Sequence, residues 1–211
     1  MDINRLNDVY FWVEMVGMVF GFIYVYYQVK KTRKMWYFWF ISSLLNIVVY
    51  HHSGFYSMMS IQFYYIVAAV YGIAQWNKTV GEAKDKYGER KSGKEVIVRR
   101  FEWKKGAISS LIAVAVYFAL VPVFSHFSQG AAVFESQPYW DTLVAVFSML
   151  ATYWLSQSYL EQWLIWIVVN AISIVIYFMG GIYFYGILYV AYLVMAVIGL
   201  VNWHRNAYYV D

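Results

Sequence analysis

Long apolar stretches alternate with short polar connections along almost the whole chain. A helix that spans the roughly 30 Å hydrocarbon core of a bilayer needs about 20 mainly apolar residues, because each residue adds about 1.5 Å. We therefore expect an all-α membrane protein. Its seven transmembrane helices are predicted at Val9–Val29, Met35–Tyr50, Ser57–Trp76, Ala107–Phe127, Trp140–Gln157, Trp163–Met179 and Ile182–Trp203.

One long polar stretch interrupts this pattern, from Asn77 to Gly106. Its charges alternate in sign, which is typical of a solvated or disordered loop. Residues 88–94 match the first seven positions of a phosphate-binding loop, but Glu95 stands where Ser or Thr is needed and no strand precedes the match. We expect a cytoplasmic loop here, and not a nucleotide site.

The Lys and Arg residues fall almost entirely on one side of a chain that crosses a membrane seven times. That side receives fifteen of them, in 30–34, in 78–105 and at Arg205, and the other side receives only Arg5. Cytoplasmic loops retain basic residues, so we expect the N-terminus outside and the C-terminus in the cytoplasm. As topology determinants, these residues explain the net charge of +4 without a nucleic-acid partner.

The composition agrees with a lipid bilayer as the surroundings. The chain is 62% hydrophobic and 13% charged, whereas about a quarter of the residues of a soluble domain are charged. Aromatic residues make up 22% of the chain, which is more ring surface than helix packing needs and indicates that some rings contact a ligand. The absence of Cys excludes disulfides, thiolate nucleophiles and Cys-ligated metal centres.

The chain also resembles itself at an offset of 127 residues, without a gap. The offset aligns the second and third predicted helices with the sixth and seventh, and it pairs Glu14 with Asp141 in the first and fifth. The matched pairs include Trp36 with Trp163, Trp39 with Trp166, Tyr50 with Tyr177, Gly72 with Gly199 and Trp76 with Trp203.

This duplication predicts two three-helix repeats in a single membrane domain, 1–211. Repeat one is 9–76, the cytoplasmic loop 77–106, the linker helix 107–127 and repeat two 140–203. Because the linker carries the chain back across the bilayer, the repeats are parallel, and such an arrangement is typical of a transporter whose site lies between the halves. Duplication for packing alone is the alternative.

A polar and aromatic stripe runs along the sixth predicted helix. Trp163, Trp166, Asn170, Ser173 and Tyr177 recur at i, i+3, i+7, i+10 and i+14, which places them on one face. The second predicted helix repeats the stripe with Asn and Ser exchanged, as Trp36, Trp39, Ser43, Asn46 and Tyr50. Two such stripes that face each other form a cavity with indole walls and amides at its base.

Each part of the stripe has a simpler explanation. Trp36 and Trp163 lie near helix starts, where Trp is common at membrane interfaces, and a membrane Asn often joins helices. Together, however, the residues favour a ligand. A cationic heteroaromatic ring gains roughly 0.5–2 kcal/mol on an aromatic face, while amides bind its polar groups.

Further candidates lie on the other helices. Glu14 and Asp141 are carboxylates within predicted spans, where an ionisable group is read as functional, although Asp141 also suits a helix N-terminus. Glu14 is therefore a candidate for substrate contact. Gln62, Tyr65 and Tyr192 complete the predicted site, with Tyr189 as a weaker addition.

The stripe Trp163-Leu-Ile-Trp166-Ile-Val-Val-Asn170 resembles the WxxWxxxN/D motif of the PnuC family of bacterial vitamin transporters. The similarity covers most of the chain, from Glu14 to Trp203. It implies two parallel three-helix repeats joined by a linker helix, as in a full-length SWEET arrangement, assembled as a homotrimer. By the same resemblance, Trp163, Trp166 and Asn170 contact the substrate, with Gln62 as a further polar contact.

The activity that the resemblance implies is facilitated diffusion of nicotinamide riboside, a small cationic aromatic vitamin, across the bacterial inner membrane. No cofactor is implied, and a cytosolic kinase traps the substrate by phosphorylation without touching the transporter. Thiamine is the second substrate, because its ring is also cationic, and the long loop and Thr152 are similar to thiamine-carrying members. A proton-coupled symporter is the lower alternative, with Glu14 as the proton carrier.

Other classes of function fit less well. A metal-dependent membrane enzyme would use His51, His52 or His126, but adjacent side chains on a helix diverge and no HExxH spacing exists, so we expect neither an enzyme nor a metal. A retinal photoreceptor needs a Lys within a span, and every Lys lies in the predicted connections. A purely structural membrane protein stays open.

Overall fold

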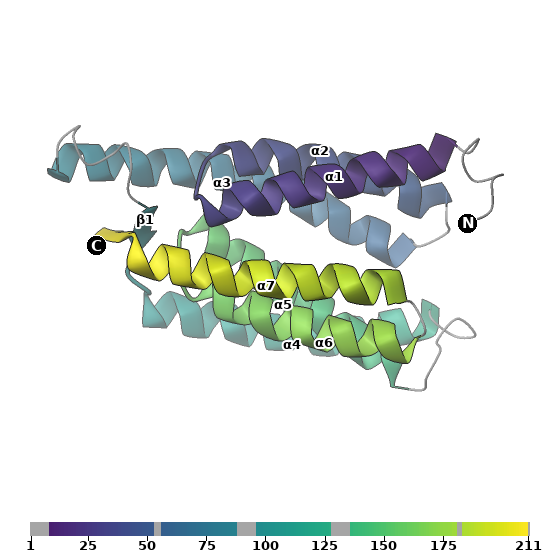
Figure 1. Cartoon of the computed structure of the whole chain (residues 1–211). Coiled ribbons are helices and arrows are strands. Elements are labelled where there is room, and N and C mark those ends of the chain that lie inside the picture. Colours follow the sequence, from purple (N-terminus) through teal and green to yellow (C-terminus); the bar gives the residue numbers. More distant parts are fainter. Residues whose placement is uncertain (1–8, 53–55, 88–95, 128–135, 181–182, 211) are drawn as a thin grey trace.

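The computed structural model describes residues 9–52, 56–87, 96–127, 136–180 and 183–210. Within these residues the chain forms seven helices and two short strands (Figure 1). In chain order they are α1 (Val9–Val29), α2 (Lys34–His52), α3 (Tyr56–Tyr87), β1 (Val96–Arg99), α4 (Trp103–Phe127), α5 (Gln137–Ser156), α6 (Gln162–Met179), α7 (Tyr183–Arg205) and β2 (Ala207–Val210).

All seven predicted spans are helical, and α1 has the predicted bounds. Three described segments are long and apolar enough to cross a membrane by length and composition, namely Trp103–His126, Gln162–Met179 and Gly186–Arg205. Helices α1 and α2 carry shorter apolar stretches, at Met15–Val29 and Lys34–Val49. The other four helices therefore stay predictions as membrane spans.

The prediction of a loop from Asn77 to Gly106 is wrong at both ends. Helix α3 continues to Tyr87, because Glu82-Ala-Lys is a run of good helix formers and no helix breaker follows before Gly88. Helix α4 begins at Trp103, four residues before the predicted start. Residues 88–95, which include the phosphate-loop match, lie outside the described residues.

The fold is not purely α-helical, because β1 and β2 form a two-stranded parallel sheet. Its register pairs Val96 with Ala207 and Arg99 with Val210. The β-branched run Val96-Ile-Val suits a strand, and the side chains of Ile97 and Val98 are buried. The sheet lies at one end of the helix bundle (Figure 1), which we call the strand end.

The helices pack as two groups of three with α4 beside the second group. Helix α2 packs on α1 and α3, and α6 packs on α5 and α7. Helix α4 packs on α5 alone among the described helices, and apolar side chains such as Leu111 and Phe118 are 70% and 69% exposed, which suits lipid. The two groups meet where α3 contacts α5 and where α1 contacts α7 (Figure 1).

Residues related by the offset of 127 make the same contacts in the two groups. A Cβ on Gly72 would overlap the indole of Trp36, and a Cβ on Gly199 would overlap the indole of Trp163. Each indole also meets a second one edge-on, Trp36 with Trp76 at 5.3 Å and Trp163 with Trp203 at 5.5 Å between centroids. The two groups therefore share one packing frame of glycine and tryptophan.

The turns that follow α1 and α5 match as well. Lys31 and Ser158, 127 residues apart, are the two described non-glycine residues in the left-handed region, with φ of 45° and 65°. The backbone N–H of Lys31 donates to Gln28 O, and that of Ser158 donates to Leu155 O, each at 2.9 Å. The same turn therefore joins the first two helices of each group.

Reciprocal hydrogen bonds connect the two groups at the strand end. The Trp76 indole on α3 donates to the carbonyl of Leu155 on α5 at 3.0 Å. The Trp203 indole on α7 donates to the carbonyls of Gln28 and Val29 on α1, each at 3.1 Å. The offset converts the first bond into the second, so each group holds the other by an equivalent contact.

Candidate functional site: a cavity between the two helix groups

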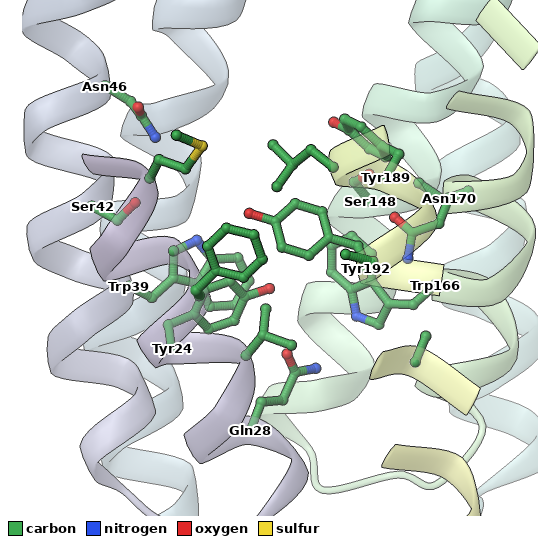
Figure 2. Close-up of a pocket in the computed structure, with 18 of the residues that line it drawn as sticks. Tyr24, Gln28, Trp39, Ser42, Asn46, Ser148, Trp166, Asn170, Tyr189 and Tyr192 are labelled. Carbon is green, nitrogen blue, oxygen red and sulfur yellow. The ribbon is translucent and has the colours of Figure 1, made fainter. Parts of the chain in front are cut away.

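A cavity of about 1130 Å³ lies between the two groups of helices. Helices α1, α2 and α3 supply one wall, and α5, α6 and α7 supply the other (Figure 2). Ligand pockets are typically about 300–1,000 Å³, so the space is large for a single small molecule. A ligand that contacts both walls would require the walls to approach each other.

Nine of the twelve predicted site residues line this cavity. They are Trp39, Asn46, Gln62, Tyr65, Trp163, Trp166, Asn170, Tyr177 and Tyr192. The structure thus brings together the two stripes, Gln62 and Tyr65 of α3, and Tyr192 of α7. The side chain of Glu14 lies outside the described residues.

Trp36 and Ser43 are buried behind the wall and do not line the cavity. Trp36 is fully buried, and its ring stacks on that of Trp39 at 5.7 Å between centroids. Trp36 therefore supports Trp39 from behind. The neighbouring Ser42 lines the cavity in place of Ser43, and its hydroxyl donates to Gly17 O at 3.0 Å.

The wall of the first group is a set of stacked rings. Tyr24 of α1 lies nearly parallel to Trp39 of α2, with centroids 4.8 Å apart and planes 19° apart. Tyr65 of α3 meets the same indole at 5.2 Å. Tyr24 and Trp39 appear side by side on this wall in Figure 2. A planar ring in the cavity finds an aromatic face here that is already held in place.

The wall of the second group combines indoles with an amide. Trp163, Trp166 and Asn170 follow one another at three- and four-residue spacing on α6 and all line the cavity. The indole Nε1 atoms of both tryptophans are buried without a hydrogen-bond partner among the described residues. A buried N–H that lacks a partner is costly, so a ligand acceptor at these donors is favoured.

The two asparagines stand at different depths in the cavity. Asn170 corresponds through the offset to Ser43, whereas Asn46 lies three residues further along α2. Three residues of helix correspond to about 4.5 Å. The cavity can therefore distinguish the two ends of an elongated ligand.

Tyr24, Gln28, Ser42 and Ser148 line the cavity and were not among the predicted residues. Gly17, Gly21, Tyr24 and Gln28 recur at i, i+4, i+7 and i+11, which places them on one face of α1. That spacing was the available signal on α1. Ser148 is the offset partner of Gly21, so the repeat carried a second signal.

Asp141 does not line the cavity, and its carboxylate accepts a hydrogen bond from Gln137 Nε2 at 3.3 Å in the first turns of α5. Among the described residues, no group of three His, Cys, Asp or Glu side chains is placed to hold a metal ion. The chemistry of the described lining is therefore that of rings, amides, hydroxyls and apolar groups.

A sequence profile of a transporter family, described as nicotinamide mononucleotide transporter, matches residues 11–205. The chain belongs to this family. The match confirms the resemblance to the PnuC family, whose curated members include similar proteins along nearly the whole chain. Membership in a transporter family, with the apolar helices, indicates a multi-pass membrane protein and not an enzyme.

Two curated relatives are nicotinamide riboside transporters PnuC. The Escherichia coli K12 protein is 22% identical and the match covers 93% of this chain and 86% of the relative. The Neisseria mucosa protein is 29% identical over 92% of this chain and 72% of the relative. The riboflavin/roseoflavin transporter RibM of Streptomyces davaonensis is 26% identical over 91% and 84%.

The fold also matches a solved PnuC structure, the crystal structure of the vitamin B3 transporter PnuC. The TM-score is 0.64 at 23% identity, and the match covers 92% of this chain and 81% of the other. The helical PnuC-family fold is therefore shown from sequence and structure independently.

Proposed function

We propose that this protein carries nicotinamide riboside across the bacterial inner membrane by facilitated diffusion. The observation that carries the proposal is the cavity between the two helix groups, in which a stacked aromatic wall faces two indole N–H donors and Asn170. The two relatives described as nicotinamide riboside transporters support the same substrate.

The chemistry of nicotinamide riboside fits this lining. Its pyridinium ring is planar and cationic and gains roughly 0.5–2 kcal/mol over the face of Trp39 or Tyr24. Its carboxamide and sugar hydroxyls lie at opposite ends of the molecule, as Asn46 and Asn170 lie at different depths. A phosphate, in contrast, needs cationic partners when it leaves water, and the described lining is aromatic, amide, hydroxyl and apolar.

Thiamine is the alternative substrate, since it too has a cationic ring and hydroxyl group. The proposed mechanism is uniport, and a cytosolic kinase keeps the gradient inward by phosphorylating the product. A symporter with Glu14 as proton carrier is the lower alternative, and uptake into vesicles that does not depend on a pH gradient would exclude it.

We place the three-helix groups in the membrane as two parallel repeats, 9–76 and 140–203, joined by a linker helix. The shared packing frame, the matching turns and the reciprocal Trp76 and Trp203 bonds support this arrangement. The strand end carries the connections rich in Lys and Arg, so it is the cytoplasmic end in the proposal. The family resemblance adds a homotrimer.

The experiment is calorimetric titration of the purified protein with nicotinamide riboside, thiamine, riboflavin and nicotinamide mononucleotide. Riboside binding that is lost in Trp166→Ala and in Asn170→Ala supports the proposal. Ser173→Ala is the matched control, because this buried hydroxyl donates to Val169 O of its own helix and does not line the cavity. Thiamine or riboflavin binding alone would reassign the substrate, and equal losses in all three variants would contradict the site.

A further inference from the structure

Gln28 lies at the boundary between the cavity and the strand end. It occupies the last turn of α1, lines the cavity, and is 2% exposed. Figure 2 shows its amide at one end of the cavity, beyond Tyr24 and Trp39 and directed into the space between the two walls. A substrate that passes from the cavity to the strand end must pass this side chain.

The Gln28 amide forms a hydrogen bond across the two helix groups. Its Nε2 donates to Oε1 of Gln162, the first residue of α6, at 3.4 Å. This is long for an N–H···O bond, for which about 2.9–3.0 Å is usual. Gln162 is fully buried, and its own Nε2 has no partner among the described residues. The pair is thus weakly bonded and retains unused hydrogen-bonding capacity.

The main chain at Gln28 explains why the side chain is not needed to hold the fold. Its carbonyl accepts the bond from Trp203, as the carbonyl of its offset partner Leu155 accepts the bond from Trp76. The second group therefore makes the same interhelix contact with an apolar Leu side chain. The buried amide is specific to the first group, where it faces the cavity.

We propose that Gln28 contacts the substrate and couples its binding to the opening of the strand end. A sugar hydroxyl or carboxamide of the substrate replaces Gln162 as the partner of the Gln28 amide, which releases the only side-chain hydrogen bond printed between α1 and α6 among the described residues. Gln162 immediately precedes Trp163 of the cavity wall, so its release frees the start of α6. The substrate identity in this inference rests on the proposed function.

The two partners are then expected to have opposite effects on affinity. Gln28→Leu, which copies Leu155, removes a substrate contact, and we expect riboside affinity to fall at least about fivefold. Gln162→Leu removes the competitor for the Gln28 amide, and we expect affinity to rise about threefold. The double variant should behave as Gln28→Leu. A purely structural pair would move affinity in the same direction in both variants, and that result would overturn the proposal.

The matched control is Gln157→Leu. Gln157 also donates a hydrogen bond between the two helix groups, to Tyr71 Oη at 2.9 Å, but it does not line the cavity. We expect its riboside affinity to match that of the parent protein. A loss of affinity in Gln157→Leu as large as that in Gln28→Leu would assign the effect to a general loosening of the interface and would contradict the proposal.

A second measurement reports opening without a substrate. The chain has no Cys, so Ser158→Cys, at a fully buried position in the turn after α5, gives a single thiol at the strand end. We expect a water-soluble thiol reagent to label it several-fold faster in the Gln28→Leu or Gln162→Leu background than in the parent or Gln157→Leu background. Unchanged labelling would remove Gln28 as a latch. Faster labelling without riboside binding in the parent would keep the latch and reject the proposed substrate.

Discussion

Trp36 and Trp163 occupy the same position in the two helix groups, but they do different things. Each packs on a glycine, Gly72 or Gly199, and each meets a second indole edge-on. Only Trp163 lines the cavity, whereas Trp36 stacks behind Trp39. The packing frame is therefore common to both groups, and the ligand-binding surface is not.

This difference shows that a site cannot be copied from one repeat to the other by the offset alone. Steric packing of a large ring on a glycine tolerates little change, so the frame stays the same in both groups. Which side of the ring meets the cavity depends on its neighbours, here Tyr24 and Trp39 in the first group. The following predictions separate the frame from the site.

The largest effect is expected from Gly199→Ala in comparison with Gly72→Ala. The new Cβ overlaps an indole in both variants, and overpacking costs about 1–3 kcal/mol of stability. Only Gly199→Ala displaces an indole that lines the cavity, so riboside affinity should fall about tenfold, which is about 1.4 kcal/mol. Calorimetry and thermal unfolding of both variants test this, and equal affinity losses would show that Trp36 is also part of the site.

The next comparison concerns the reciprocal bonds at the strand end. Trp76→Phe removes a donor to one carbonyl, and Trp203→Phe removes a donor to two. Each lost hydrogen bond costs about 0.5–1.5 kcal/mol, so both variants should unfold at lower temperature, Trp203→Phe the more so. If Trp203→Phe leaves the unfolding temperature unchanged, the bond from Asn202 to Val29 O at 2.8 Å is sufficient there.

A smaller effect distinguishes the two matching turns by pH. The Lys31 ammonium lies 4.6 Å from the ring centroid of Trp203 and 5.3 Å from that of Trp76. Burial, with a contribution from Arg99, holds the pKa of Lys31 well below its usual value. Between that lowered pKa and the unfolded value of about 10.5, the unfolded chain binds more protons, so stability rises with pH.

Lys31→Met should remove this rise. The variant is expected to unfold at a higher temperature than the parent below the lowered pKa, and the difference should vanish as the pH approaches about 10.5. Thermal unfolding across this range tests the prediction, with Ser158→Ala as the control at the matching position that carries no charge. A constant difference at every pH would mean that Lys31 does not titrate in the folded protein.

The smallest effect is expected from glycine at the same two turns. A left-handed conformation costs a non-glycine residue about 1–2 kcal/mol, and the flexibility of glycine in the unfolded chain offsets much of the gain. Ser158→Gly should therefore stabilise by a few tenths of a kcal/mol. Lys31→Gly should gain less, because it also loses the contacts with Trp76 and Trp203, and denaturant midpoints of the two variants measure this difference.

Hydropathy and the self-alignment predicted most of the fold, because each span depends on its own apolar composition. The strand pair was missed since Val96–Arg99 is short, lies in a charged segment, and pairs with Ala207–Val210 far along the chain. The extension of α3 was missed because a charged helix beyond the membrane has no hydropathy signal. Only its helix propensity distinguished it from a loop.

Within the site, spacing on a single helix was informative and the orientation between helices was not. Trp163, Trp166 and Asn170 share one face of α6, so their common exposure to the cavity followed from geometry. Tyr24 and Gln28 could be placed only once α1 was known to pack beside α2 and α7. Asn46 and Ser43 differ by less than a full helical turn, and the rotation of α2 decides which of them meets the cavity.

The parallel pairing of β1 with β2 sets an order of events during synthesis. From the end of β1 at Arg99 to the start of β2 at Ala207, the ribosome adds 108 residues. At roughly 5–20 residues per second this takes about 5–20 s. During that time β1 has no strand partner while α4 to α7 are made. The strand end therefore closes last, after the helices that form the cavity already exist.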